Sequence, residues 1–124
     1  MGSIKINVTV GKTELENQFS GVLIATNEEG DKKITFNYVC KNPIIELEIK
    51  LIDSDGNETL LKGSRYSKDL FKNVDERQKY LILFSFDIIM ILIERMINFP
   101  DIEEPISGTQ SFGVNEIAMN LIFG

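Results

Sequence analysis

The sequence predicts an α+β fold, in which an antiparallel sheet in meander order is followed by a long helix packed on it. In the first half of the chain, apolar and polar residues alternate, as is typical of strands with one buried face. In the second half, an apolar stretch with helical spacing replaces this alternation. We expect a single domain over residues 1–124, because a chain of this length builds one core.

Five strands are expected within residues 1–62, which make up the predicted sheet. The expected strands cover residues 4–10, 19–26, 34–40, 45–53 and 58–62. The fourth is the clearest, because its apolar residues Ile45, Leu47 and Ile49 alternate with charged ones. Links of a few residues between successive strands favour antiparallel neighbours in meander order.

A long helix is predicted over residues 75–98, after a crossover segment over residues 63–74 that breaks the strand alternation. Asn73 is placed to cap the helix, and Asp75 suits the positive end of the helix dipole. Pro100 is expected to end the helix, because proline disfavours a helical conformation in the residue before it.

The last part of the chain, residues 99–124, is expected to be a proline-bearing link followed by a short terminal element. The link has the acidic sequence Asp-Ile-Glu-Glu-Pro over residues 101–105. Apolar residues return over residues 112–123, and they fit either a short helix or a strand. The sequence leaves these two alternatives open.

The predicted long helix is apolar around most of its circumference. Leu83 and Met90 lie outside its two main apolar faces, and Asp87 and Glu94 line up as a narrow polar stripe. A helix that lies on one sheet needs an apolar arc of only about 100°. A surplus of exposed apolar surface usually marks an interface, so we expect the helix to bind a client or a second copy of the chain. The side chains expected to do so are Leu81, Phe84, Phe86, Ile88, Met90, Leu92, Ile93 and Met96.

A membrane span is the rival interpretation of this helix. Asp87 interrupts the apolar run, and the Glu94-Arg95 pair closes it before the length of about 20 apolar residues that a span needs. We therefore expect no membrane insertion.

The charge balance excludes some classes of partner. The chain has 13 basic and 19 acidic residues, and its formal net charge is −6. Nucleic acids and anionic membrane surfaces bind basic proteins, so neither is an expected partner. Glu46 and Glu48 lie on the outward row of the fourth expected strand, where they form either a solvated face or a docking surface for a basic partner.

The residue types present give little support for an enzyme. The chain has no histidine and one cysteine, Cys40, which excludes Ser-His-Asp and Cys-His catalysis and an intrachain disulfide. Asp87 among apolar neighbours is either a general acid or part of a polar stripe, and no second catalytic group is placed with it. We expect a non-catalytic protein without metal or cofactor. A lone thiol and the absence of a recognisable signal peptide favour the cytoplasm.

Four short segments follow one another in the carboxyl half of the chain. They are Ile82-Leu83-Phe84-Ser85-Phe86, Phe99-Pro100, Pro105-Ile106, and a segment over residues 112–120 that begins with Phe112. In this order they resemble the SecB family of export chaperones and its shorter SecB-like relatives. In that family a sheet of antiparallel strands precedes a long helix, a Phe-Pro pair lies at the helix end, and a proline-containing link leads to a Phe-led terminal helix.

The resemblance implies a dimer or a dimer of dimers, with helices packed between sheets and grooves that accept non-native polypeptide. It also implies that the partners are preproteins and a translocation ATPase, or an antitoxin. Glu46 and Glu48 would then be the docking residues. Function as a SecB-like chaperone or adaptor is therefore our leading hypothesis.

A small-ligand binding protein is the second hypothesis. A phage or bacterial protein of this kind would bind a nucleotide signal without catalysis, in a polar pocket lined by arginine. Arg65, Arg77 and Arg95 are the arginines of the chain.

Overall fold

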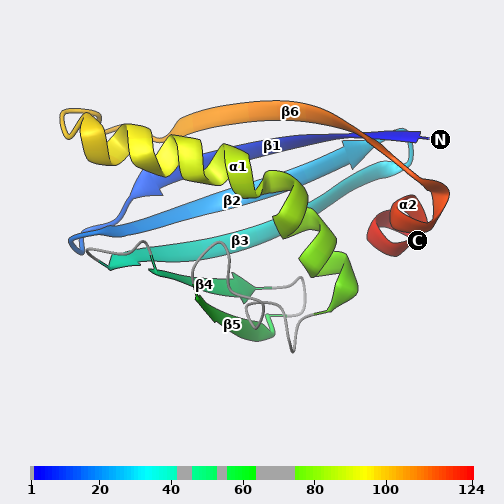
Figure 1. The fold of residues 1–124 in the computed structure, drawn as a ribbon, viewed down its shortest axis with the longest axis horizontal. Coiled ribbons are helices and arrows are strands. Elements are labelled where there is room, and N and C mark those ends of the chain that lie inside the picture. The colour runs from blue at the N-terminus through cyan, green and yellow to red at the C-terminus, as the bar shows by residue number, and fades with distance from the viewer. Residues whose placement is uncertain (1, 42–45, 53–55, 64–74) are drawn as a thin grey trace.

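The computed structural model describes residues 2–41, 46–52, 56–63 and 75–124 (Figure 1). The described residues have an α+β fold with a six-stranded antiparallel sheet and two helices, as the sequence predicts for the fold class. The strands are β1 (Gly2–Lys12), β2 (Gln18–Asn27), β3 (Gly30–Lys41), β4 (Glu46–Ile52), β5 (Glu58–Gly63) and β6 (Ile106–Val114). The helices are α1 (Glu76–Asn98) and α2 (Glu116–Phe123).

The strands lie in the order β5-β4-β3-β2-β1-β6. The first five are joined in meander order, which confirms the predicted antiparallel meander. β6 follows α1 in the chain and returns to the far side of the sheet, where it pairs with β1. The pairing is in unbroken register from Gly2 opposite Val114 to Val10 opposite Ile106. The first described strand is therefore an interior strand of the sheet.

The terminal part of the chain differs from what the sequence predicts. The apolar segment over residues 112–123 is neither one helix nor one strand, because its start belongs to β6 and its remainder forms α2. The resemblance to SecB proteins implies that Phe112 begins a terminal helix. Phe112 lies in β6 instead. The strand is hard to recognise because glycine and glutamine occupy the inward positions 108 and 110, where apolar residues would mark the alternation.

The two ends of α1 are explained by local hydrogen bonds. The side chain of Asp75 accepts a hydrogen bond of 2.7 Å from the backbone N–H of Arg77, so Asp75 is the N-cap. The predicted cap, Asn73, lies outside the described residues. At the other end, the backbone N–H of Phe99 donates to the carbonyl of Arg95, and Pro100 follows.

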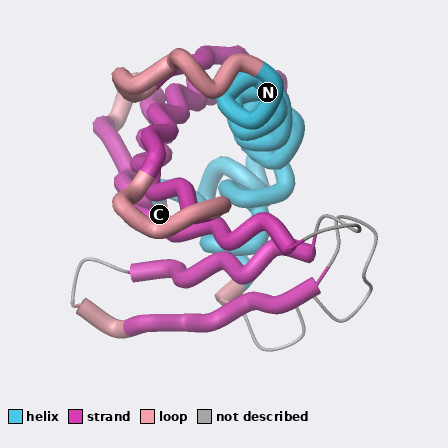
Figure 2. The backbone as a smooth tube through the Cα atoms, turned by 90° about the vertical axis from the view of Figure 1, so that its left-hand side faces the viewer, coloured by secondary structure: helices cyan, strands magenta, loops and turns pink. Residues whose placement is uncertain are grey.

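The sheet is curved, and α1 lies on its concave side. Figure 2 shows the strands bending around the helices, and α1 packs on β1, β2 and β6. The concave side carries the alternating apolar residues of the strands, among them Ile6, Val8, Leu23 and Ile49, all almost completely buried. These residues and the inner side of α1 form one core.

The buried face of α1 is broad. The buried side chains of the helix are Leu81, Ile82, Ser85, Phe86, Ile88, Ile89, Met90, Leu92, Ile93 and Met96. At 3.6 residues per turn they spread over about 200° of the helix circumference. This arc is wider than the arc of about 100° that a helix on one sheet needs, and β1, β2, β6 and α2 all pack against the helix.

The short helix α2 closes the core at the end of the molecule away from the C-terminus of α1 (Figure 1). The side chain of Asn115 caps it by accepting from the backbone N–H of Ala118 at 2.8 Å. Ala118 and Ile122 are buried, and Arg77 donates through Nε to the carbonyl of Leu121 at 2.9 Å.

Candidate functional site

The structure places the predicted interface residues of α1 mainly in the chain's own core. Leu81, Phe86, Ile88, Met90, Leu92, Ile93 and Met96 are buried, and Phe84 is partly buried. In this conformation a partner cannot contact the buried side chains directly. Their role in client binding stays a prediction, and the apolar surface that a partner can reach lies elsewhere.

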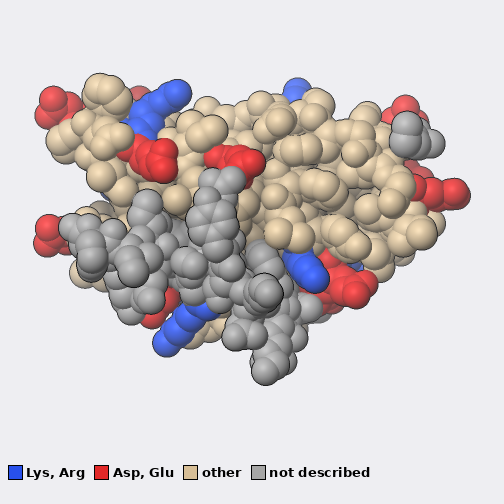
Figure 3. Space-filling view, in the orientation of Figure 1, with Lys and Arg blue, Asp and Glu red and all other residues tan. Residues whose placement is uncertain are grey.

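The exposed apolar side chains of α1 flank its polar stripe and continue past its end. Leu83 and Ile91 lie on either side of Asp87 and Glu94, while Ile97 and Phe99 lie at the C-terminal end. The exposed fraction is 56% for Ile91 and 62% for Phe99. Figure 3 shows acidic groups on this face within a largely uncharged surface.

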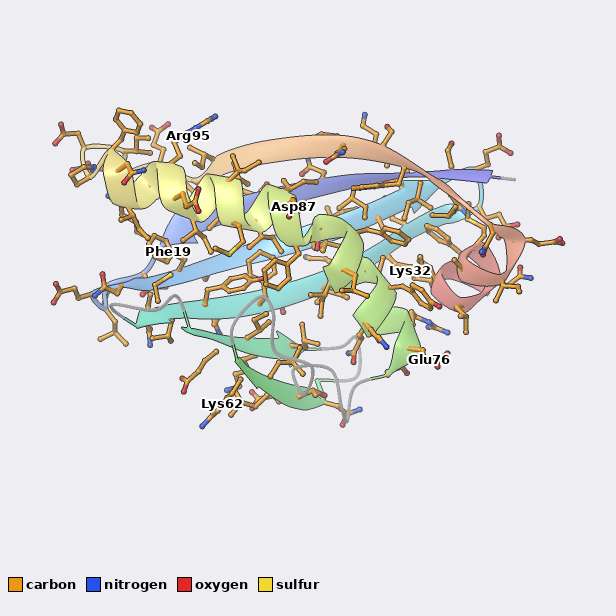
Figure 4. The ribbon with its side chains drawn as sticks, viewed as in Figure 1. Phe19, Lys32, Lys62, Glu76, Asp87 and Arg95 are labelled. Atoms are coloured by element: carbon orange, nitrogen blue, oxygen red, sulfur yellow. The ribbon has the colours of Figure 1, made fainter. Side chains whose placement is uncertain are left out.

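A hollow at one end of the molecule lies next to this apolar surface, and we call it the tip hollow. It has a volume of about 410 Å³ and is lined by residues 12–19, together with Met96, Ile97 and Pro100. The floor includes Phe19, which is buried against α1, and Figure 4 labels it beside the C-terminal half of that helix. The rim includes Leu15, whose exposed fraction is 63%.

The link between β1 and β2 is held in place by hydrogen bonds. Lys12 Nζ donates to the carbonyl of Pro100 at 2.6 Å, which ties the link to the end of α1. Within the link, the N–H of Thr13 donates to the carbonyl of Gln18, and that of Gln18 to the carbonyl of Leu15. These bonds turn the chain so that Leu15 stands at the surface.

A second hollow, of about 430 Å³, lies on the outer face of the sheet. Thr9, Thr35, Asn37 and Pro105 are among its lining residues. The large exposed apolar side chains of the described residues do not line it. The tip hollow is therefore the better candidate for binding an apolar group.

The predicted acidic docking residues lie on β4. Glu48 forms an ion pair of 3.7 Å with Lys62 on β5, and Lys50 forms one of 3.0 Å with Glu58. Lys62 is labelled beside β5 in Figure 4. The outer face here carries charges of both signs, and docking of a basic partner at Glu48 stays a prediction. The side chain of Glu46 lies outside what the structure describes.

Asp87 is exposed on α1. The sequence offered it as a candidate general acid buried among apolar neighbours, and the structure does not bury it. It belongs to the exposed stripe with Glu94. Among the residues that the structure describes, no group of three acidic or cysteine side chains is placed to hold a metal ion.

Two titratable groups belong to β3 and lie in or beside the core. Burial raises the pKa of the Tyr38 phenol beyond the range in which tyrosine normally ionises, and Cys40 adds to this effect. Burial also raises the pKa of the Cys40 thiol. Because the thiolate is the nucleophilic form, the structure makes Cys40 a poor nucleophile.

Alkylation of Cys40 by iodoacetamide at about pH 8 is expected to be several-fold slower in the folded protein than in the unfolded one. The raised pKa lowers the thiolate fraction, and the partly buried position restricts access. The measurement is the rate of mass gain with and without guanidinium. Equal rates in the two states would contradict this assignment.

The described arginines do not converge on one site. Arg77 and Arg95 lie near opposite ends of α1, about 27 Å apart at 1.5 Å per residue. Arg77 is also bound to α2 through its hydrogen bond to Leu121. Arg65, the third arginine that the sequence offers for a nucleotide pocket, lies outside the described residues.

Sequence reasoning missed both the tip hollow and the sixth strand. The sequence feature that could have indicated the hollow is Leu15, a large apolar residue inside an otherwise polar link.

No helix in the described part of the chain is long and apolar enough to cross a membrane. No family model matches the chain, and comparisons with curated proteins and with solved structures find no match either.

Proposed function

We propose that the protein binds extended, non-native polypeptide segments without catalysis, as a SecB-like chaperone or adaptor. The observation that carries the proposal is the apolar rim of the tip hollow, formed by Leu15 and Ile97 with Phe99 beside it. All three side chains are exposed. Large apolar side chains gathered around a concave surface are typical of a binding site.

The size of this surface favours weak, reversible binding. Covering one large apolar side chain contributes about 1.5–3 kcal/mol, so three contribute roughly 5–9 kcal/mol before any cost is subtracted. Ordering a flexible client opposes this gain. A net dissociation constant in the micromolar range or weaker is the result. A protein that holds a client and then releases it requires this kind of affinity.

The surroundings of the tip hollow suit a polypeptide client. Glu14 and Glu16 lie on the link that lines it, while Arg95 is exposed near the end of α1. Polar and charged groups around an apolar centre are common at surfaces that bind peptides reversibly. Preproteins and antitoxins, the clients that the SecB resemblance implies, both present extended apolar segments.

The test is binding of a fluorescently labelled, extended apolar peptide, followed by anisotropy. The double variant Leu15→Ser, Phe99→Ser is expected to weaken binding at least tenfold, because it removes two apolar contacts at the rim. Ile117→Ser is the matched control, since Ile117 is 71% exposed and lies on α2 at the other end of the molecule. Unchanged affinity in the double variant, or an equal loss in the control, would disprove the assignment.

A further inference from the structure

β6 is an edge strand without the features that normally protect such an edge. It is nine residues long, and among the described strands it pairs with β1 alone. Natural edge strands are commonly short, bulged, or marked by lysine or proline, which prevents other chains from pairing with them. β6 has no charged residue, no proline and no break in its register. The opposite edge, β5, is shorter and carries Glu58 and Lys62.

The middle of β6 is open on both faces. Thr109, Gln110 and Ser111 are consecutive and all exposed. Because successive side chains of a strand point to opposite faces, neither face is covered at this point. The outward edge of β6 is therefore accessible to another strand.

The residues of β6 complement themselves when two copies pair antiparallel about Gln110. Phe112 of one copy then lies opposite Gly108 of the other, on the side that faces α1. The Phe112 ring lies 5.3 Å from that of Phe84, and a Cβ on Gly108 would meet Ile88 at 2.9 Å, which places both residues on this side. A large ring opposite a glycine fills space that the glycine leaves open.

The outer face of β6 fits the same register. Thr109 lies opposite Ser111 of the second copy, so two hydroxyl groups face each other and no charges meet. Within one copy, Asn7 donates to Thr109 Oγ1 at 2.7 Å, and Thr9 and Ser107 are joined by a hydroxyl hydrogen bond of 2.7 Å. Pairing would extend this row of small polar contacts across the new strand boundary.

Charge also favours this surface for contact between two copies. Each chain has a net charge of −6, so two copies repel each other in general. β6 carries no charge, so pairing along it brings no like charges directly opposite one another.

The side of α1 next to β6 provides apolar contacts for an added strand. Phe84 packs on Phe112, and Ile91 lies two turns further along the same side of the helix with 56% of its surface exposed. A strand added to β6 would lie about 4.8 Å beyond it and would cover this side of the helix.

We infer that two copies of this chain associate through antiparallel pairing of their β6 strands about Gln110, which joins the two sheets into one. The contact surface is separate from the tip hollow, so the two assignments can fail independently. It also differs from the interface predicted from the sequence, which used the helix residues that the structure buries.

The test uses opposite charges at the centre of the pairing. Gln110→Lys and Gln110→Glu each place like charges opposite one another across the two-fold axis. Each variant alone is expected to show the monomer mass of 14.1 kDa by light scattering, at concentrations where the unaltered protein shows twice that mass. Mixing the two variants is expected to restore the doubled mass, because the charges are then opposite.

Leu60→Lys is the control, because it adds a lysine at an exposed position of the opposite edge strand, β5. It is expected to leave the mass unchanged. Circular dichroism and urea unfolding establish that every variant is folded. An unaltered protein that is a monomer at its highest soluble concentration would overturn the inference. So would Gln110 variants that remain dimers when they are alone.

Discussion

Alanine at Ile89 is expected to lower the free energy of unfolding by about 2–5 kcal/mol, while alanine at Ile91 is expected to change it by less than about 0.5 kcal/mol. The two residues have the same side chain and lie two positions apart on α1. Ile89 is 1% exposed and faces the sheet, so its truncation leaves a cavity in the core. Urea unfolding followed by circular dichroism measures both values.

The comparison is made in the Gln110→Lys background, so that association of two copies does not add to the stability of either variant. A large loss at Ile89 is a substantial part of the 5–15 kcal/mol that stabilises a typical domain. If the two substitutions had equal effects, α1 would not be seated in the curved sheet as described. The pair therefore tests the packing that decides which apolar residues of the helix a partner can reach.

Alanine at Gly21 is expected to destabilise the protein by about 1–3 kcal/mol, although alanine normally replaces glycine in a strand without loss. Gly21 lies on β2 between Val10 of β1 and Phe36 of β3. An added Cβ would overlap the backbone oxygen of Thr9 and would lie 2.6 Å from Cε2 of Phe36. The ring can move, but the oxygen belongs to the sheet and cannot move without distorting it.

Gly113→Ala is the matched control for this prediction. Gly113 also lies within a strand, and an added Cβ there would meet no atom within 4 Å. Its substitution is expected to be neutral or slightly stabilising, because alanine restricts the unfolded chain. Thermal or urea unfolding of both variants in the Gln110→Lys background checks the difference, because Gly113 lies on β6 and association of two copies must not contribute. A Gly21 variant as stable as the control would contradict the close approach of β1, β2 and β3.

The sequence predicted the parts of the fold that depend on local patterns. Apolar alternation and one short apolar run over residues 19–26 identified five strands, and the helical spacing from Leu81 onward identified α1 to within about one residue. The curvature of the sheet could not be predicted in this way, because it arises from the combined twist of all the strands. The helix sequence therefore does not show how much of the broad apolar surface of α1 is buried by the chain's own sheet and by α2.

β6 and the tip hollow were missed for different physical reasons. β6 has glycine at position 108 and glutamine at position 110, so it lacks an apolar alternation, and its place is fixed by pairing with a strand about a hundred residues earlier. The hollow is formed where the link around Leu15 meets the end of α1. Contacts between such distant segments leave no periodic signal in either segment.

The pairing of β1 with β6 has a consequence for how the chain folds during synthesis. During synthesis β1 is made long before β6, because the rest of the meander and α1 lie between these two strands in the chain. Until β6 is made, β1 is an open edge of the sheet. The hydrogen bond between Asn7 and Thr109 joins residues that are 102 positions apart in the chain. Pairing over such a distance is slow, because the loop must close before its contacts form. The partly made protein therefore exposes an apolar strand that a molecular chaperone would need to protect.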